Sequence, residues 1–363
     1  MLNIKRTNRP LAALAILVAS ACTDGTGPNE RRFDAKNVRA GVSAIEGITS
    51  SKALTSMQAV ARSMGIVGAS SIAQKIGSGS GLAGSGSGLD VVTRKLTTAA
   101  VDAGTALIPV MRPSVLGTTF VYEPAVRMYV PDPARTGAPS NGVRFILYEV
   151  DPNEDPLTSK EIGYADLTDE RRSSASSAGI RLEAVIGGVT KLAYSFDLTG
   201  SVQAAQFNVF GYIADGGDRL DFSIKTSQQL FGRGGKVTLE AKLFVAQEDF
   251  EVTAKIEGIA GEENGDGKID LTIRAKLDEV AVDAETTAGK LDATFKVNGQ
   301  LLATATGDPK SPLIRGDGGR ELTDEETQTL GAIVGMADGI FKFVSQLLQP
   351  AGALLLIALG IGS

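Results

Sequence analysis

Residues 236–245 read Lys-Val-Thr-Leu-Glu-Ala-Lys-Leu-Phe-Val, and residues 250–256 read Phe-Glu-Val-Thr-Ala-Lys-Ile. In both stretches apolar residues alternate with threonine or charged residues, so one face of each strand is apolar and the other is polar. The same period of two runs through residues 268–277 and 291–305. An antiparallel sheet with one buried and one solvated face gives this alternation. We therefore expect the body of the chain to be a water-exposed antiparallel sheet.

Turn residues separate the alternating segments and indicate that consecutive strands pair as hairpins. Gly-Gly at 187–188, Asp-Gly-Gly-Asp at 215–218 and Asn-Gly at 298–299 each lie between two apolar runs. These sequences are typical of tight turns, and Asn-Gly is the strongest of them. Between residues 179 and 306 they predict about eight strands or more in meander order. The pattern resembles the curved antiparallel sheet, closed by helices, of carriers and receptors of periplasmic lipoproteins and of some lipid-binding lipoproteins, and this resemblance implies that the sheet is curved.

The part of the chain before residue 179 also predicts strands. Residues 118–122 and 127–130 indicate two short strands among proline-rich loops. Residues 142–150 are apolar on both faces, as in strands that are covered on each side. We expect a central strand there.

Apolar residues at helical spacing predict helices before and after the sheet. Residues 35–76 carry them at intervals of three and four, with an interruption at Ser50 and Ser51, which indicates a helical pair. Residues 323–349 begin with a capping box and continue as an apolar stripe that ends at Pro350. We expect this amphipathic C-terminal helix to pack on the sheet. The predicted fold class is α+β.

Composition divides the rest of the chain into connecting segments. Residues 22–34 are polar and rich in glycine and proline, as in a flexible tether. Residues 77–88 are almost entirely glycine and serine and predict a linker. The β-rich domain then covers 89–363, and its apolar tail, 351–363, is expected in the same core as the helix.

The first residues resemble the signal of bacterial lipoproteins. Lys5, Arg6 and Arg9 precede an apolar run at 11–18, and small residues stand directly before Cys22, the only cysteine. In that family the cysteine thiol receives a diacylglyceryl group before signal peptidase II cuts ahead of it. The resemblance thus implies a signal peptide at 1–21 and a lipid on Cys22. A soluble secreted product is the alternative, whereas the apolar run is shorter than the roughly 20 residues of a membrane-spanning helix.

The resemblance also implies a place in the cell. In that family an aspartate directly after the cysteine retains the protein in the inner membrane, and this chain has Thr23 there. We expect a protein anchored in the cell envelope through its lipid, in the outer membrane and facing the periplasm. The inner membrane stays open as an alternative.

Charge and composition exclude several functions. Removal of residues 1–21 takes away three cations and changes the formal net charge from −6 to −9, which disfavours nucleic acid as a partner. The chain contains no histidine, which excludes Ser-His-Asp catalysis and the usual zinc and non-haem iron sites. It also lacks tryptophan, a common platform for sugars. We therefore expect a protein that is not an enzyme and carries no cofactor.

Two short sequences resemble functional motifs, but each has a simpler explanation. Residues 262–270 resemble the first half of an EF-hand calcium loop, but Ile273 stands where a bidentate glutamate is required. Because the flanking segments are strand-like, we expect an acidic hairpin turn and no tight calcium site. The Arg-Gly-Asp sequence at 315–317 matches the adhesion tripeptide in an expected loop, but a match of three residues arises easily by chance.

The apolar face of the sheet is the remaining candidate site. Alanines among its larger residues leave room for a closely packed helix or for an acyl chain. The positions that we consider for a hydrophobic groove, without assigning any of them a role, are Leu239, Ala241, Leu243, Val252, Ala254 and Leu271. Two hypotheses follow: a non-catalytic lipoprotein that binds a lipid or other hydrophobic ligand there, or a structural or assembly lipoprotein that binds an envelope protein. The C-terminal helix filling the groove is the alternative to an open one.

Overall fold

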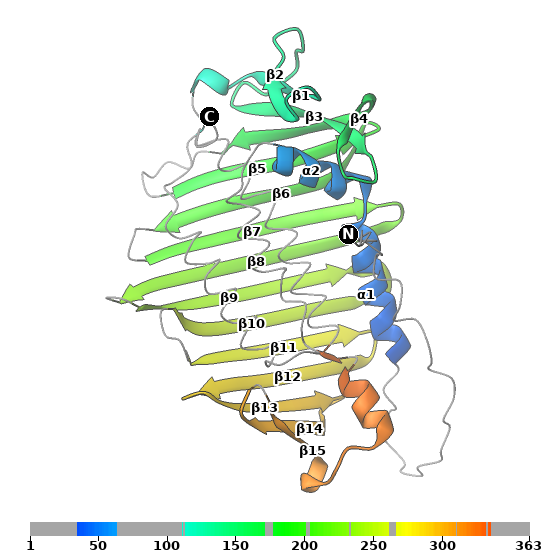
Figure 1. The fold of residues 1–363 in the computed structure, drawn as a ribbon, viewed down its shortest axis with the longest axis vertical. Coiled ribbons are helices and arrows are strands. Elements are labelled where there is room, and N and C mark those ends of the chain that lie inside the picture. The colour runs from blue at the N-terminus through cyan, green and yellow to red at the C-terminus, as the bar shows by residue number, and fades with distance from the viewer. Residues whose placement is uncertain are drawn as a thin grey trace, which may run out of the picture. The chain divides into compact units, whose positions relative to one another are not determined.

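The computed structural model describes residues 35–63, 111, 113–170, 177–200, 204–231, 234–260, 266–309, 311–331 and 333–334. Its 15 described strands form a single sheet (Figure 1), in which β3 to β15 follow one another in chain order. All pairings from β3 to β15 are antiparallel, and β1 pairs parallel with β3 and antiparallel with β2. The meander is confirmed, and the sheet is larger than the eight or so strands that turn spacing predicts.

The sheet has short elements at its beginning and long strands in its middle. Its strands are β1 (Thr118–Glu123), β2 (Met128–Pro131), β3 (Gly142–Val150), β4 (Pro156–Asp169), β5 (Ser177–Ile186), β6 (Val189–Gly200), β7 (Ala204–Asp215), β8 (Asp218–Phe231), β9 (Gly234–Val245), β10 (Phe250–Ala260), β11 (Gly267–Ala275), β12 (Asp278–Thr287), β13 (Lys290–Val297), β14 (Gln300–Gly307) and β15 (Leu313–Gly316). The helices are α1 (Ala35–Thr49) and α2 (Lys52–Ser63), with short 3-10 turns η1 (Pro113–Val115), η2 (Ala246–Glu248) and η3 (Asp317–Gly319). Residues 324–331 are also helical.

The predicted hairpin turns are confirmed. Gly187 and Gly188 join β5 to β6 with φ of 58° and 79°, and Asn298 and Gly299 join β13 to β14 with φ of 51° and 80°. Two consecutive positive φ values define the type I′ turn, whose twist matches that of the flanking strands. Residues 216–217 likewise connect β7 and β8.

Three strands, β4, β12 and β15, have no counterpart among the predicted segments. The turn before β12 consists of Lys276 and Leu277, which are not turn-forming residues, although Lys276 adopts a φ of 57°. Residues 158–161 of β4 are exposed, and its alternation of buried and partly buried residues is confined to the second half of the strand. In contrast, β3 is buried at four consecutive positions, 145–148, which confirms a strand covered on both faces.

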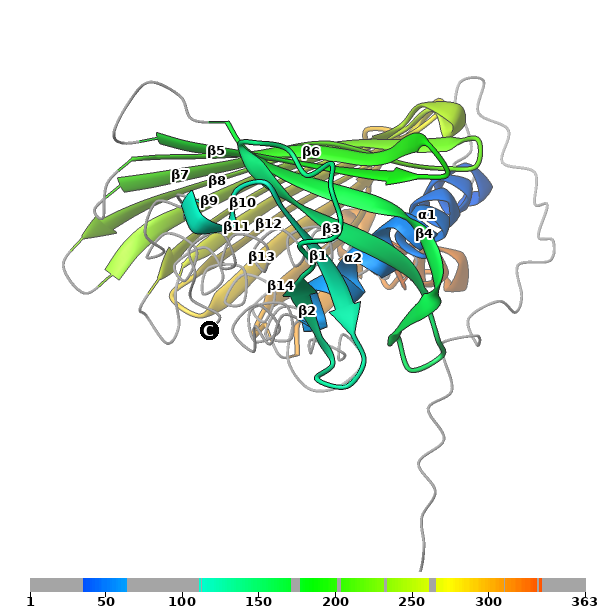
Figure 2. The same ribbon diagram turned by 90° about the horizontal axis from the view of Figure 1, so that it is seen from above.

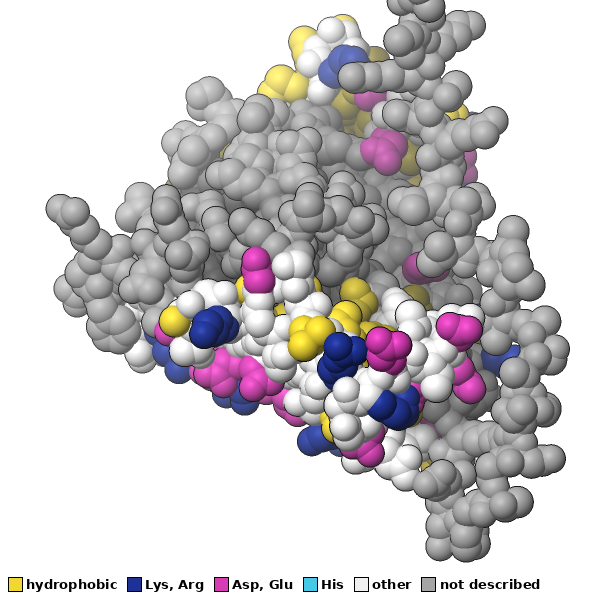
Figure 3. Space-filling model, turned by 60° about the horizontal axis from the view of Figure 1, so that its bottom comes forward, with side chains coloured by type: hydrophobic (Ala, Val, Ile, Leu, Met, Phe, Trp, Pro, Cys, Tyr) yellow, Lys and Arg dark blue, Asp and Glu magenta, His cyan; other side chains and the backbone are white. Residues whose placement is uncertain are grey.

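The register arranges one face of the sheet as apolar and the other as charged. On the polar face, Lys242 pairs with Glu251 at 2.7 Å and Lys236 pairs with Glu257 at 3.0 Å, each across the β9–β10 ladder. Basic and acidic side chains lie beside one another on the described surface (Figure 3). Such exposed pairs contribute little stability each, but they keep this face in water. The predicted division into a buried and a solvated face is confirmed.

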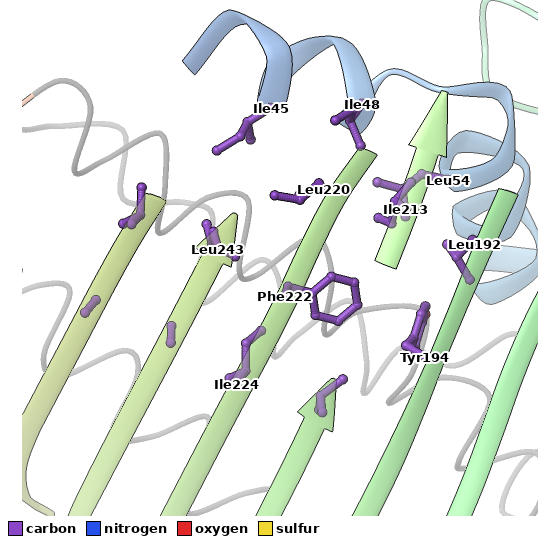
Figure 4. Packing of buried hydrophobic residues seen from close by; sticks show 14 of the residues in the cluster. Ile45, Ile48, Leu54, Leu192, Tyr194, Ile213, Leu220, Phe222, Ile224 and Leu243 are labelled. Atoms are coloured by element: carbon purple, nitrogen blue, oxygen red, sulfur yellow. The ribbon is translucent and has the colours of Figure 1, made fainter. Parts of the chain in front are cut away.

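Helices α1 and α2 lie on the concave side of the curled sheet (Figure 2), with α1 contacting β7, β8, β9 and β11, and α2 contacting β2 to β6. Ile45 and Ile48 of α1 and Leu54 of α2 are directed toward Leu220 and Ile213 of the sheet (Figure 4). All five are buried, and each contributes on the order of 1.5–3 kcal/mol when removed from water. The helices therefore cover the sheet at one end of its strands.

A polar network fixes the beginning of α1 to the far half of the sheet. Asn37 Nδ2 donates to Asp278 Oδ2 at 3.0 Å, and Asn298 Nδ2 donates to Asp278 Oδ1 at 3.3 Å. Asn298 Oδ1 in turn accepts from the backbone N–H of Glu279 at 2.8 Å. Because Asp278 is buried, these bonds replace those that its carboxylate would otherwise make with water.

The capping box at the start of the C-terminal helix is confirmed. The backbone N–H of Glu326 donates to Thr323 Oγ1 at 3.2 Å, and that of Thr323 donates to Glu326 Oε2 at 2.8 Å. Leu330 and Ile333 are buried in the same core as the sheet, so the described start of this helix packs as predicted. Residues 1–34, 64–110, 335–349 and 351–363, with the predicted signal, tether, linker and apolar tail, lie outside the described residues.

Candidate functional site

The six positions considered for a groove form one contiguous set, which we call the apolar patch. Leu239, Ala241 and Leu243 lie on β9, Val252 and Ala254 on β10, and Leu271 on β11. Ala254 is the cross-strand partner of both Ala241 and Leu271, and Val252 is that of Leu243. All six are buried, with 0–7% of their surface exposed. The structure therefore brings together the residues that the sequence singles out.

The apolar patch begins beside α1 and continues along the strands away from it. Phe250, the first residue of β10, packs so closely on α1 that a Cβ on Gly41 would lie 2.1 Å from its ring. Val252 and Ala254 follow on the same face of β10. Further across the sheet Ala284, Ala293 and Ala305 pair in one row. The alanine side chains protrude less from the sheet than the larger side chains around them.

Tyr194 adds a polar atom to this mostly apolar face. Its side chain is 2% exposed, and within the described part of the chain its hydroxyl has no hydrogen-bond partner. The rings of Phe196 and Phe222 lie at 5.1 and 5.8 Å from its ring, both edge-on, and hold it in place. Tyr194 and Phe222 are labelled in Figure 4. An unpaired buried hydroxyl costs about 1–3 kcal/mol. An unpaired donor in a packed core requires an explanation, and a water molecule, an ion or a ligand can supply the missing acceptor.

Among the described residues, no charged group contributes to the pKa of Tyr194. Burial alone raises the pKa of the Tyr194 phenol, and the hydroxyl therefore remains protonated, a hydrogen-bond donor, across physiological pH. Among the described residues the buried polar or charged side chains are those of Ser51, Ser56, Thr119 and Asp278, and no cation belongs to them. In the sequence Tyr194 occupies an inward position of the alternation. A hydroxyl at such a position is the signal that could have identified it.

The two edges of the sheet are candidates for binding a protein partner. Both outer strands, β2 and β15, are only four residues long. Leu313 and Ile314 on β15 are exposed by 55% and 39%, and Met128 on β2 by 39%. Very short edge strands offer few free backbone groups and are a common protection against pairing with another chain.

The Arg-Gly-Asp sequence is not in a loop, contrary to expectation. Arg315 and Gly316 end β15, and Asp317 begins η3. Arg315 lies 3.7 Å from Glu321, and the backbone N–H of Gly316 donates to Arg320 O at 2.8 Å. Because strand pairing and these contacts engage the tripeptide, it lacks the protruding geometry of an adhesion loop.

The acidic turn is flanked by strands, as predicted. It connects β10 to β11, and Glu262 and Asn264 lie outside the described residues. Asp266 Oδ1 accepts from the backbone N–H of Ala288 at 2.8 Å, whereas Asp270 pairs with Lys268 at 2.9 Å. Across the described ranges no cluster of three or more acidic, cysteine or histidine residues could hold a metal ion.

The chain matches no protein-family model, no curated protein and no solved structure. None of the helices in the described part of the chain is long and apolar enough to span a membrane. Cys22, the predicted lipidation site, is outside the described residues.

Proposed function

We propose that this protein is a non-catalytic, lipid-anchored protein of the cell envelope that binds a hydrophobic ligand on the apolar face of its sheet. The observation that carries the proposal is the apolar patch on β9, β10 and β11, which lies on the helix-bearing face beside α1. Anchoring through Cys22, in the outer membrane and facing the periplasm, rests on the lipoprotein-like signal. The net negative charge disfavours nucleic acid as a partner, and the apolar face favours a hydrophobic ligand.

The energetics of such binding follow from the burial of the patch. Apolar contact contributes about 25 cal/mol per Å² removed from water. Because the six side chains are 0–7% exposed, a ligand gains only the difference between its own contacts and those that it replaces within the chain. The alanines at 241 and 254 favour the ligand, since an acyl chain fits closely over methyl groups.

A structural or assembly role is the second candidate. Exposed Leu313 and Ile314 on β15 favour it, because apolar residues on a free edge suit a protein partner. The four-residue length of β15 limits the number of backbone hydrogen bonds that such a partner could form. We therefore favour the ligand-binding function.

Organic extraction of the purified full-length Cys22→Ser protein tests the proposal. This variant excludes lipid that belongs to the anchor itself, and we expect lipid to be released in a stoichiometric amount. Ala254→Leu should lower that amount because it fills the patch. Thr253→Leu, on the neighbouring residue whose side chain takes the polar face, should leave it unchanged. Absence of lipid from the parent protein, together with no uptake of added lipid, would contradict the proposal.

A further inference from the structure

Tyr194 and the apolar patch occupy the same row of the sheet. The register pairs Tyr194 on β6 with Gly211 on β7, Gly211 with Phe222 on β8, and Phe222 with Leu243 of the patch on β9. Three strand spacings of about 4.8 Å place the two backbones about 14 Å apart. A ligand that covers the patch and extends along this row therefore reaches the Tyr194 hydroxyl.

We propose that the Tyr194 hydroxyl donates a hydrogen bond to an uncharged carbonyl oxygen of the bound ligand, which is therefore an acyl ester such as a glycerolipid. The inference rests on the proposed function and specifies the chemical class of its ligand. The hydroxyl is buried, has no acceptor among the described residues, and is held by two aromatic rings. A donor fixed in this way loses little freedom on binding.

The surroundings of the hydroxyl favour an ester over an ionised fatty acid. A carboxylate brought into an apolar core requires a cation or several hydrogen bonds to offset its lost hydration. Among the described residues no lysine or arginine is buried, and Tyr194 offers a single hydrogen bond. An ester carbonyl requires no more than that.

Tyr129 is the matched control within the same core. It is also a buried tyrosine, 4% exposed, but its hydroxyl donates to Ile146 O at 2.9 Å. Its donor is thus already used, and a ligand has nothing to gain from it. Replacing each tyrosine by phenylalanine removes one oxygen and leaves the ring.

The test compares three probes of similar chain length on the full-length Cys22→Ser protein: methyl oleate, oleate at alkaline pH, and 1-octadecene. We expect methyl oleate to bind about fivefold to tenfold more tightly than 1-octadecene, as one net hydrogen bond provides. Tyr194→Phe should abolish that preference while binding 1-octadecene as the parent does. Tyr129→Phe should preserve it.

Other results of the binding test contradict specific parts of the proposal. Persistence of the ester preference in Tyr194→Phe would refute the role of the hydroxyl. Oleate binding as tightly as methyl oleate would refute the uncharged acceptor. If the parent protein binds 1-octadecene without any ester preference, the inference fails and the proposed function stands; if it binds none of the probes, both fail.

Discussion

Tyr129 and Tyr194 show how one atom can have opposite consequences at two buried positions. The Tyr129 hydroxyl donates a hydrogen bond to the backbone of β3, whereas the Tyr194 hydroxyl has no partner in the described ranges. The ring of each is packed against other aromatic side chains. The two positions therefore differ in the hydrogen bonding of the hydroxyl alone. Its effect on the free energy of unfolding can be measured without a ligand.

We predict that Tyr129→Phe lowers the free energy of unfolding by about 1 kcal/mol, because a net hydrogen bond is lost. Tyr194→Phe should not lower it, since the removed hydroxyl is unpaired and costs energy in the ligand-free core. Chemical denaturation of lipid-free protein measures both. Equal losses in the two variants would show that the Tyr194 hydroxyl has an acceptor.

Glu326 makes the stability of the start of the C-terminal helix depend on pH. Its hydrogen bond with Arg320, aided by the backbone and hydroxyl of Thr323, lowers its pKa from the ordinary 4.5 to about 2. A pKa lowered by folding means that the carboxylate stabilises the folded state above pH 4.5. That contribution disappears as the pH falls toward 2.

We predict that Glu326→Gln removes part of the acid dependence of stability between pH 4.5 and about 2. Glu325→Gln, at the exposed neighbouring position, is the control and should preserve that dependence. Denaturation curves of the three proteins across this pH range measure it. Parallel pH profiles for the parent and Glu326→Gln would refute the prediction.

At the scale of elements, α1 contains two glycines with opposite surroundings. A Cβ on Gly41 would lie 2.1 Å from Cγ of Phe250, whereas nothing lies within 4 Å of a Cβ on Gly47. Helix propensity favours alanine over glycine by about 1 kcal/mol at either position. Only at Gly41 would the added methyl group clash with the sheet and so offset the gain in helix propensity.

We predict that Gly47→Ala raises the free energy of unfolding by up to about 1 kcal/mol. Gly41→Ala should lower it by about 1–3 kcal/mol, because Phe250 or the whole helix must move. Both variants are compared by chemical denaturation. A stabilised Gly41→Ala would mean that α1 does not pack on β10 as described.

The elements differ in how far the sequence reveals them. Strands that alternate cleanly and end at Gly-Gly or Asn-Gly, such as β5 and β13, follow from the sequence, because the period and the turn agree. The sequence does not predict β12, because the turn before it is Lys276-Leu277, which are not turn-forming residues. The left-handed φ of Lys276 is imposed by the sheet. The parallel pairing of β1 with β3 is equally hidden, as it joins segments separated by a long connection.

For the candidate site, too, the sequence predicts only part of what the structure shows. Alternation predicts which residues of β9, β10 and β11 face inward, and the structure confirms that they are adjacent. Alternation also places Tyr194 inward. It does not show that the hydroxyl lacks a partner, because this depends on side chains brought close by folding.

At the scale of the whole molecule, Cys22 decides where the protein resides. We predict that Cys22→Ser abolishes incorporation of a labelled fatty acid and leaves the protein unprocessed or soluble, because serine lacks the thiol that is acylated. Metabolic labelling and fractionation of cells measure these two results. Cys22→Ala is the matched variant and should behave identically. Undiminished label on either variant would refute the lipoprotein interpretation.

The meander has a consequence for the order in which the protein folds. From β3 to β15 every strand pairs with its predecessor, so the sheet can grow by successive hairpins, each closing a short loop. The bond between Asn37 and Asp278 is different, because it joins residues 241 positions apart. It forms only once β12 is in place, and so α1, although first in the chain, completes its docking late. Apolar surface of the growing sheet that the helices do not yet cover is exposed to water, and such surface favours aggregation during folding.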